Sequence, residues 1–161
     1  MRPKLPSPHR PRITAPIKRL DEVRYDVLDR LLGYALRRAQ VTMFFAFHEA
    51  TRGEDITPPR FTALVIIGAN PGLSQTVLGN VLGIARSGAM QLTDWFEGKN
   101  LVERRRREGD GRAWGLYLTR RGEAVVARLK RRVIRYDQAR ARRLSAGEKR
   151  ELLRLLDKLA G

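Results

Sequence analysis

The stretch that decides the fold is residues 74–118, SQTVLGNVLGIARSGAMQLTDWFEGKNLVERRRREGDGRAWGLYL. Ser74 to Leu82 has the pattern of a short helix, and Gly83 is a turn residue. A longer helix is predicted from about Arg86 to Lys99. Two strands follow, on either side of the glycine-rich loop Glu108–Arg112, and they cover residues 101–107 and 113–118. The predicted buried face of the longer helix consists of Ala89, Leu92, Trp95 and Phe96.

Helical patterns flank this segment on both sides. A first helix is predicted from about Asp26 to Glu49, and Thr57-Pro58-Pro59 begins a second, because Thr is a good N-cap and Pro fits the first turn. Thr119 caps a long helix that reaches about Arg143, and the capping box Ser145–Glu148 starts a last one. The fold class is therefore mainly α with a small β-wing, a winged helix-turn-helix with further helices at both ends.

The charge balance points to a polyanionic partner. The 161 residues include 33 Lys and Arg against 17 Asp and Glu, a net charge of +16. Such self-repulsion destabilises a compact domain, so nucleic acid is the first candidate partner and an anionic membrane surface the second. The chain has no Cys, which excludes disulfides and thiolate metal sites. No apolar run is long enough to span a bilayer and no secretory signal is apparent, so we expect a cytoplasmic protein.

The predicted helix-turn-helix and hairpin suit double-stranded DNA. A helix fits the major groove, where its first turns reach the base edges, and a β-hairpin beside it can reach the backbone or the adjacent minor groove. Arginine is favoured in a narrow minor groove by the negative potential there. The predicted hairpin carries several such cations, at Arg104, Arg105, Arg106, Arg107 and Arg112.

The chain resembles the MarR (multiple antibiotic resistance regulator) family of bacterial transcription factors over nearly all of residues 25–161. Five motifs carry the resemblance in the family's order and spacing: Leu78-Gly79-Asn80-Val81-Leu82-Gly83-Ile84, the recognition-helix segment Arg86–Glu97, Leu101-Val102-Glu103-Arg104, Asp110-Gly111-Arg112 and Leu118-Thr119-x-x-Gly122. The departures are Gly79 for Ala, Asn100 for Gly, and Gly88 and Met90 where the family often has Ser or Thr.

The resemblance implies a homodimer whose N- and C-terminal helices interleave, and the apolar surface of the first and last helices agrees with it. Residues 1–22 would form a basic, Pro-rich arm and residues 23–161 a MarR-type domain. Within that domain, the winged helix-turn-helix covers about 57–118 and the dimerisation helices about 25–50 and 119–160. Two interpretations of the arm stay open, a disordered tail or a segment that contacts DNA or the partner subunit.

The DNA-contacting residues are predicted on the second helix of the motif and on the hairpin. Arg86, Ser87 and Gln91 are candidates for base contacts, since Arg pairs with guanine and Gln with adenine, and Met90 belongs to the same predicted surface. The alternative is contact with phosphates only.

On the hairpin we expect DNA contact for Arg112 and at least one of Arg105, Arg106 and Arg107, the alternative being a solvated charged strand. The resemblance implies that Asp110 braces the wing through an ion pair, although Asp-Gly also fits a plain turn.

An effector site is predicted on the first two helices, where aromatic side chains accompany two adjacent arginines. Such a combination suits an aromatic carboxylate, or an aromatic acyl-CoA thioester whose phosphates the arginines would hold. The alternative is that the phenylalanines belong to the core and the arginines are solvated or touch DNA. The candidate residues are Tyr34, Arg37, Arg38, Phe44, Phe45, Phe47, His48 and Phe61.

No motif for catalysis, cofactor or metal binding is apparent, and His9 and His48 are too isolated for a metal site. The predicted function is a ligand-responsive, sequence-specific transcriptional regulator, a repressor that acts as a homodimer on a pseudo-palindromic operator. The alternative is an architectural, nucleoid-type protein that binds DNA without sequence preference, which the charge of +16 and the basic arm favour.

Overall fold

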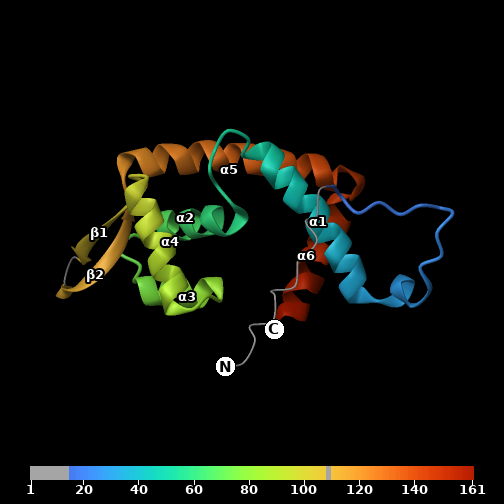
Figure 1. Cartoon of the computed structure of the whole chain (residues 1–161), viewed down its shortest axis with the longest axis horizontal. Coiled ribbons are helices and arrows are strands. Elements are labelled where there is room, and N and C mark those ends of the chain that lie inside the picture. Colours follow the sequence, from blue (N-terminus) through green and yellow to red (C-terminus); the bar gives the residue numbers. More distant parts are fainter. Residues whose placement is uncertain (1–14, 108–109) are drawn as a thin grey trace, which may run out of the picture. The chain divides into compact units, whose positions relative to one another are not determined.

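The computed structural model describes the backbone of residues 15–107 and 110–161, and the side chains of these residues other than 110–112. Most of the predicted arm (residues 1–14) and two residues of the hairpin loop, Glu108 and Gly109, lie outside it. The described chain is mostly helical, with one antiparallel hairpin (Figure 1). Its elements are η1 (Asp26–Arg30), α1 (Leu32–Ala50), α2 (Pro58–Ala69), α3 (Gln75–Leu82), α4 (Arg86–Gly98), β1 (Val102–Arg107), β2 (Asp110–Leu118), α5 (Arg120–Arg140), η2 (Ala141–Arg143) and α6 (Ala146–Ala160).

The chain divides into two compact units, Met1–Phe45 and Ala46–Gly161. In the first unit, the helix predicted from Asp26 is interrupted, because Leu31 adopts an extended conformation (φ −90°, ψ 113°) between η1 and α1. The apolar spacing continues across Leu31, so periodicity alone did not reveal this break. The segment before it is held by an Arg19–Asp29 ion pair and by the Arg19 guanidinium, 4.3 Å from the centre of the Tyr25 ring.

The core of the second unit lies between α2, α4, α5 and the base of the hairpin. The helices contribute apolar residues at helical spacing, and the strands contribute apolar residues at alternating positions. Burial of their apolar surface is the main favourable contribution to the folding of this unit. Figure 1 shows α2 beside the first half of α5, with the hairpin projecting outward from this part of the unit. The largest fully buried side chains are those of Leu64, Ile67, Leu78, Phe96, Leu116 and Leu129.

The hairpin is fastened to the loop that precedes α3. The Gly72 N–H donates to the Leu116 carbonyl and the Leu116 N–H donates to the Leu73 carbonyl, each at 2.9 Å. Gly115 permits this approach, since a Cβ there would lie 2.7 Å from the Gly72 backbone. The second strand begins at Asp110 rather than at Ala113, so the predicted loop was too long.

The last two helices begin as their sequences predict. The Thr119 hydroxyl caps α5 by accepting from the Gly122 N–H (3.0 Å), and Ser145 and Glu148 form a reciprocal capping box at the start of α6. The long helix ends at Arg140, and a 3-10 turn covers the last three residues of the predicted helix. None of the described helices is both long and apolar enough to cross a membrane.

Candidate nucleic-acid interface

The turn between α3 and α4 is fixed by its local sequence. The Ser74 hydroxyl accepts from the Val77 N–H (3.2 Å) and caps the start of α3. Gly83 ends this helix in the left-handed conformation (φ 63°), which glycine adopts without steric penalty. The Ile84 N–H then donates to the Gly79 carbonyl, and α4 starts two residues later. The resulting helix-turn-helix matches the sequence prediction.

The helix α4 buries one face and exposes the other. Its buried residues are Ala89, Thr93 and Phe96, and the Thr93 hydroxyl donates to the Ala89 carbonyl (2.8 Å). Leu92 and Trp95, predicted as buried, are half-buried beside them. The three candidates for base contacts and Met90 are all exposed, and their spacing of one, three and one residues puts them on the opposite side of the first two turns: Arg86, Ser87, Met90 and Gln91.

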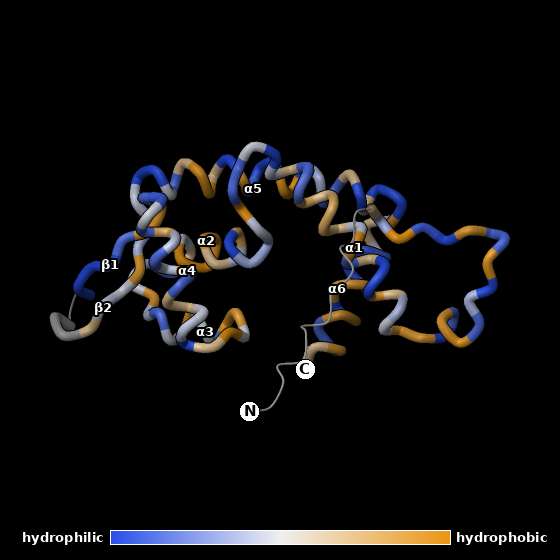
Figure 2. Tube along the Cα trace, viewed as in Figure 1, coloured by the Kyte–Doolittle hydropathy of each residue, from blue (hydrophilic) through white to orange (hydrophobic). Residues whose placement is uncertain are grey.

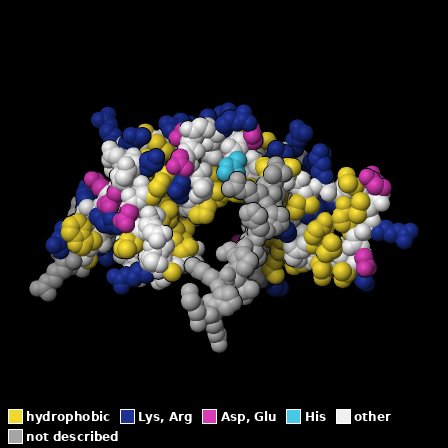
Figure 3. All heavy atoms as spheres, viewed as in Figure 1, with side chains coloured by type: hydrophobic (Ala, Val, Ile, Leu, Met, Phe, Trp, Pro, Cys, Tyr) yellow, Lys and Arg dark blue, Asp and Glu magenta, His cyan; other side chains and the backbone are white. Residues whose placement is uncertain are grey.

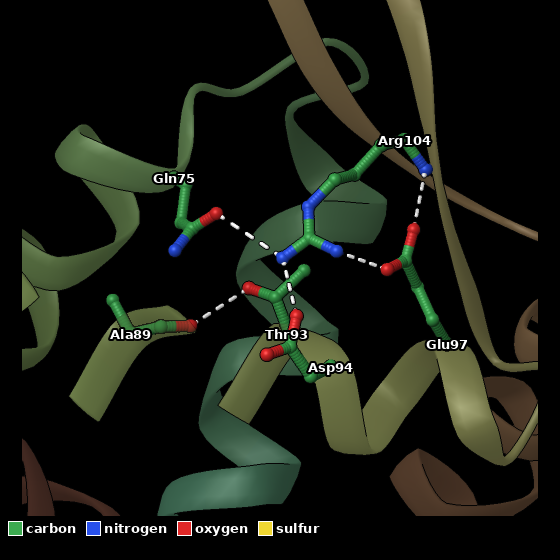
Figure 4. Close-up of polar contacts among 6 residues, drawn as sticks. All are labelled: Gln75, Ala89, Thr93, Asp94, Glu97 and Arg104. Carbon is green, nitrogen blue, oxygen red and sulfur yellow. Dashed lines mark hydrogen bonds and ion pairs between the residues drawn. The ribbon is translucent and has the colours of Figure 1, made fainter. Parts of the chain in front are cut away.

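Arg104 of β1 binds the C-terminal half of α4 (Figure 4). Its guanidinium pairs with the Glu97 carboxylate and donates to Asp94 Oδ1 at 2.8 Å, and it also donates to Gln75 Oε1 of α3 at 3.3 Å. The Arg104 backbone N–H donates to the other Glu97 oxygen (3.1 Å). Charge-assisted hydrogen bonds of this kind are stronger than neutral ones, so one side chain fastens the hairpin to both helices of the motif.

The pairing register assigns the hairpin's side chains to two faces. Arg104 pairs with Leu116 and Arg106 with Trp114, which puts these four residues on the face that meets the core and α4. The opposite face carries an Arg105–Glu103 ion pair (3.2 Å), and the Arg105 guanidinium lies 4.1 Å from the centre of the Tyr117 ring.

The hairpin's positive charge continues toward its tip. Arg105, Arg106 and Arg107 are exposed, and β1 is the strongly hydrophilic strand in Figure 2. Arg107 also lines a shallow pocket of about 290 Å³ with the loop before α3 and with Ser74. Helix N-termini carry partial positive charge, so the start of α3 and Arg107 together favour an anionic group at this position.

The structure brings most of the predicted DNA-contacting residues into one region, because Arg104 holds the hairpin of Arg105–Arg107 against α4. The side chains of Asp110 and Arg112 lie outside the described residues, so the predicted brace at Asp110 stays a prediction. The sequence reasoning counted Arg104 as a hairpin cation and missed its contacts with Asp94 and Glu97. The two-residue period of a strand puts Arg104 on the same face as the buried Val102, which indicates that its side chain points inward but does not identify its partners.

The candidate effector residues fall into both units. Within the first unit, the Arg38 guanidinium lies 5.8 Å from the centre of the Tyr34 ring, and its buried Nε has no hydrogen-bond partner in the described chain. The Arg37 side chain donates to Gln40 Oε1 (3.3 Å). Phe44 and Phe45 meet edge to face with their ring centres 6.0 Å apart. An orphaned guanidinium nitrogen is costly when buried, and an anionic ligand would supply the missing acceptor.

Within the second unit, the Phe47 and Phe61 rings lie 5.7 Å apart and pack against the buried core. His48 lies edge to face with Phe47 at 6.3 Å. These contacts favour the alternative interpretation, in which these phenylalanines are core residues. Within the described chain, no three His, Cys, Asp or Glu side chains are grouped closely enough to hold a metal ion.

Comparison with known proteins identifies close similarities. Residues 54–113 match the sequence profile of the MarR family. A transcriptional regulatory protein assigned to the hcr operon of Thauera aromatica is 36% identical over 129 residues, which span 80% of this chain and 78% of that protein.

Two solved structures extend the similarity to the fold. The transcriptional repressor CouR bound to a 23-mer DNA duplex has a TM-score of 0.80 and 35% identity, covering 87% of this chain and 99% of CouR. CouR bound to p-coumaroyl-CoA has a TM-score of 0.75 and 34% identity, covering 86% and 98%.

Proposed function

The chain belongs to the MarR family of winged helix-turn-helix transcriptional regulators, and on that premise we propose that it is a homodimeric repressor whose DNA affinity is lowered by an aromatic effector. One observation carries the DNA-binding part of the proposal. The exposed first half of α4 presents Arg86, Ser87, Met90 and Gln91 beside a hairpin that Arg104 fastens to the same helix. A helix held in this way can enter the major groove while the hairpin contacts the flanking DNA.

The homodimer is supported by apolar side chains left exposed near both ends of the described chain. Monomeric proteins rarely expose so many, and a second copy is the occupant that the family implies. Figure 3 shows hydrophobic side chains gathered over the segment before α1. The exposed residues are Leu20, Val23, Val27, Leu28, Leu31 and Leu32 before and at the start of α1, and Leu152, Leu153, Leu155 and Leu159 on α6.

The effector is proposed to be an aromatic carboxylic acid or its CoA thioester. Arg38, whose guanidinium lies 5.8 Å from the centre of the Tyr34 ring, and the adjacent Arg37 supply cationic groups for a carboxylate or for the phosphates of coenzyme A. CouR, a relative of similar fold, binds p-coumaroyl-CoA. Titration of p-coumaroyl-CoA and p-coumaric acid into the protein–DNA complex is expected to release the DNA, and an Arg37→Ala/Arg38→Ala double variant is expected to stay bound.

The decisive experiment for the function is selection of DNA fragments by the protein, followed by footprinting. We expect a pseudo-palindromic site whose half-sites are about 10 base pairs apart, one turn of the duplex. Protection of one asymmetric half-site would contradict the dimer. Gln91→Ala should lower the preference for the selected site, whereas Arg107→Ala should weaken all sequences and reduce the salt dependence by about one counterion.

The competing function is non-specific DNA packaging, which the net charge of +16 favours. The two are distinguished by the ratio of affinities for the selected site and for random DNA at one salt concentration. Specific regulators typically bind their sites at least about a thousandfold more tightly than random DNA. A ratio close to one would assign the protein to the architectural class.

A further inference from the structure

Trp114 is a large aromatic residue that the core of the second unit does not use. It lies on β2 and is 54% exposed, although its strand neighbours Gly115 and Leu116 are buried. Figure 3 shows a hydrophobic surface among Lys and Arg side chains at the hairpin. About half of this large ring stays in contact with water in the free unit, which points to a further contact made when a partner is bound.

The register settles which way the Trp114 side chain is directed. Trp114 pairs with Arg106, two positions beyond the Arg104–Leu116 pair, so all four residues share one face. Arg104 on that face binds Asp94 and Glu97 of α4. Trp114 therefore lies on the α4 side of the hairpin, about 7 Å farther from the core than Leu116 at the strand rise of two residues. DNA held by α4 would meet this face of the hairpin.

The neighbours of Trp114 favour DNA over a second protein chain. The Arg106 guanidinium lies 4.8 Å from the centre of the Trp114 ring, and Arg105 and Arg107 flank Arg106 on the same strand. These three arginines make the surface around Trp114 strongly positive, and a polyanion is attracted to it. The deoxyribose faces that line the minor groove are apolar and lie between phosphates, which matches an indole ring next to a guanidinium.

We propose that Trp114 packs against deoxyribose in the minor groove beside the major-groove segment that α4 occupies, with Arg106 pairing to an adjacent phosphate. This contact rests on the proposed DNA-binding function. It adds a residue whose contribution to binding depends on the width of the minor groove. An indole of fixed size fits a groove wall only over a limited range of widths, so Trp114 gives the hairpin a preference for DNA shape where it makes no base-specific hydrogen bond.

The first test is the fluorescence of Trp114 on a duplex that the wild-type protein has selected from random DNA. The chain has two tryptophans, and Trp114→Phe supplies the Trp95 background to be subtracted. We expect the Trp114 signal to be accessible to acrylamide in the free protein and protected in the complex. A Trp114 signal that is shielded before DNA is added, or still quenched after saturation, would overturn the proposal.

The second test is affinity and salt dependence. Trp114→Ala should weaken binding about tenfold, equivalent to about 1.4 kcal/mol, and Trp114→Phe should keep most of the affinity. Neither variant removes a cation, so the slope of log K against log salt should stay at the wild-type value, whereas Arg106→Ala should reduce it by about one. If the slope of log K against log salt for Trp114→Ala falls as it does for Arg106→Ala, the loss of affinity comes from a displaced Arg106. That result would overturn the proposal.

Hydroxyl-radical footprinting locates the contact, because this reagent attacks deoxyribose. Trp114→Ala should lose protection at one or two sugars per half-site while protection under α4 persists. If the wild-type protein and Trp114→Ala protect the same sugars, the proposed Trp114 contact is wrong, whereas the proposed function as a regulator still stands. Failure of the wild-type protein to select any duplex would instead contradict the proposed function itself.

Discussion

At the scale of single residues, Arg104 joins the hairpin to α4. Its side chain is 26% exposed and binds carboxylates on α4 at two positions. Arg104→Ala leaves Glu97 and Asp94 close together without a cation between them. We expect the free energy of unfolding to fall by about 1–2 kcal/mol, less than for a fully buried pair because solvent screens part of the interaction. Urea denaturation measures this change.

Arg105→Ala is the matched control, since it removes the same side chain one position away on the opposite face. Arg105 pairs with Glu103 where both side chains are about half exposed. Exposed ion pairs contribute little, so this substitution should change the free energy of unfolding by less than about 0.5 kcal/mol. Equal losses in the two variants would mean that Arg104 does not fasten the hairpin to α4.

Gly122 provides a second prediction at this scale. A Cβ at this position would collide with the carbonyl oxygen of Leu101, and the Gly122 N–H is also held by the Thr119 cap. Gly122→Ala should destabilise the protein by about 3 kcal/mol, because neither backbone segment can move without breaking the cap. Gly98→Ala, where a Cβ meets nothing within 4 Å, should be neutral or stabilising. Thermal unfolding of both variants tests the contrast.

What the sequence predicts at this scale is limited to residues whose environment is set locally. The exposure of Arg86, Ser87, Met90 and Gln91 follows from the helical spacing of Ala89 and Phe96, and the structure agrees. The ion pair of Arg104 with Glu97 could not be predicted, because a turn and a change of element separate them. Whether a cation meets a carboxylate across such a turn depends on tertiary packing.

At the scale of helices and strands, α4 contains a glycine that lowers its stability. Gly88 lies within the helix, and an added Cβ would touch Ile84 at an ordinary 3.8 Å. Gly88→Ala should therefore stabilise the protein by up to about 1 kcal/mol. Gly79→Ala in α3 should stabilise the protein less, because the added Cβ would lie only 3.2 Å from the Cβ of Ala89. Chemical denaturation of both variants measures the difference, and a larger gain at Gly79 would contradict the packing described here.

The capping box of α6 predicts a dependence on pH. The pKa of Glu148 is lowered because its carboxylate accepts a hydrogen bond from the Ser145 backbone N–H (2.7 Å). A pKa that is lower in the folded than in the unfolded state stabilises the folded protein. This stabilisation is fully present above the ordinary pKa of 4.5, and it is lost as the pH falls through the pKa of the folded state. The wild-type protein should unfold at a higher temperature than Glu148→Gln above that range, and the difference should shrink below it. A constant difference from pH 7 to pH 3 would argue against the capping carboxylate.

The sequence predicts the helices and strands better than it predicts the contacts of single residues. Local signals such as Thr57-Pro58, Ser74, Thr119 and the Ser145 capping box fix where helices begin, and the structure confirms each of these starts. The errors occur where the pattern of apolar residues continues through a backbone change, as at Leu31. Glycines in the hairpin loop likewise concealed that β2 already starts at Asp110.

At the scale of the whole molecule, α6 displays leucines that its own chain leaves exposed. Leu152 lies at the centre of this apolar face and is 45% exposed. If a second copy covers the face, Leu152→Glu puts a charge into each half of a symmetric interface and should shift the dimer toward monomer by well over tenfold in dissociation constant. Sedimentation at several protein concentrations measures this shift.

Arg150→Gln is the control for this experiment. It lowers the net charge by the same single unit, and helical spacing puts Arg150 on the opposite side of α6 from Leu152. Its dimer should be as stable as that of the wild type. A Leu152→Glu protein that sediments like the wild type at every concentration would show that α6 is not covered by a second copy.

The anchoring of α4 by Arg104 has a consequence for how such a protein can acquire new targets. The carboxylates that hold the hairpin, Asp94 and Glu97, occupy the last turns of the helix, whereas the exposed residues from Arg86 to Gln91 occupy the first. Substitutions in the first turns leave the fastening untouched, so the recognition sequence can drift or be exchanged between paralogues while the scaffold stays folded. Transplanting residues 86, 87, 90 and 91 from another regulator into this chain should thus transfer that regulator's DNA preference in a single step.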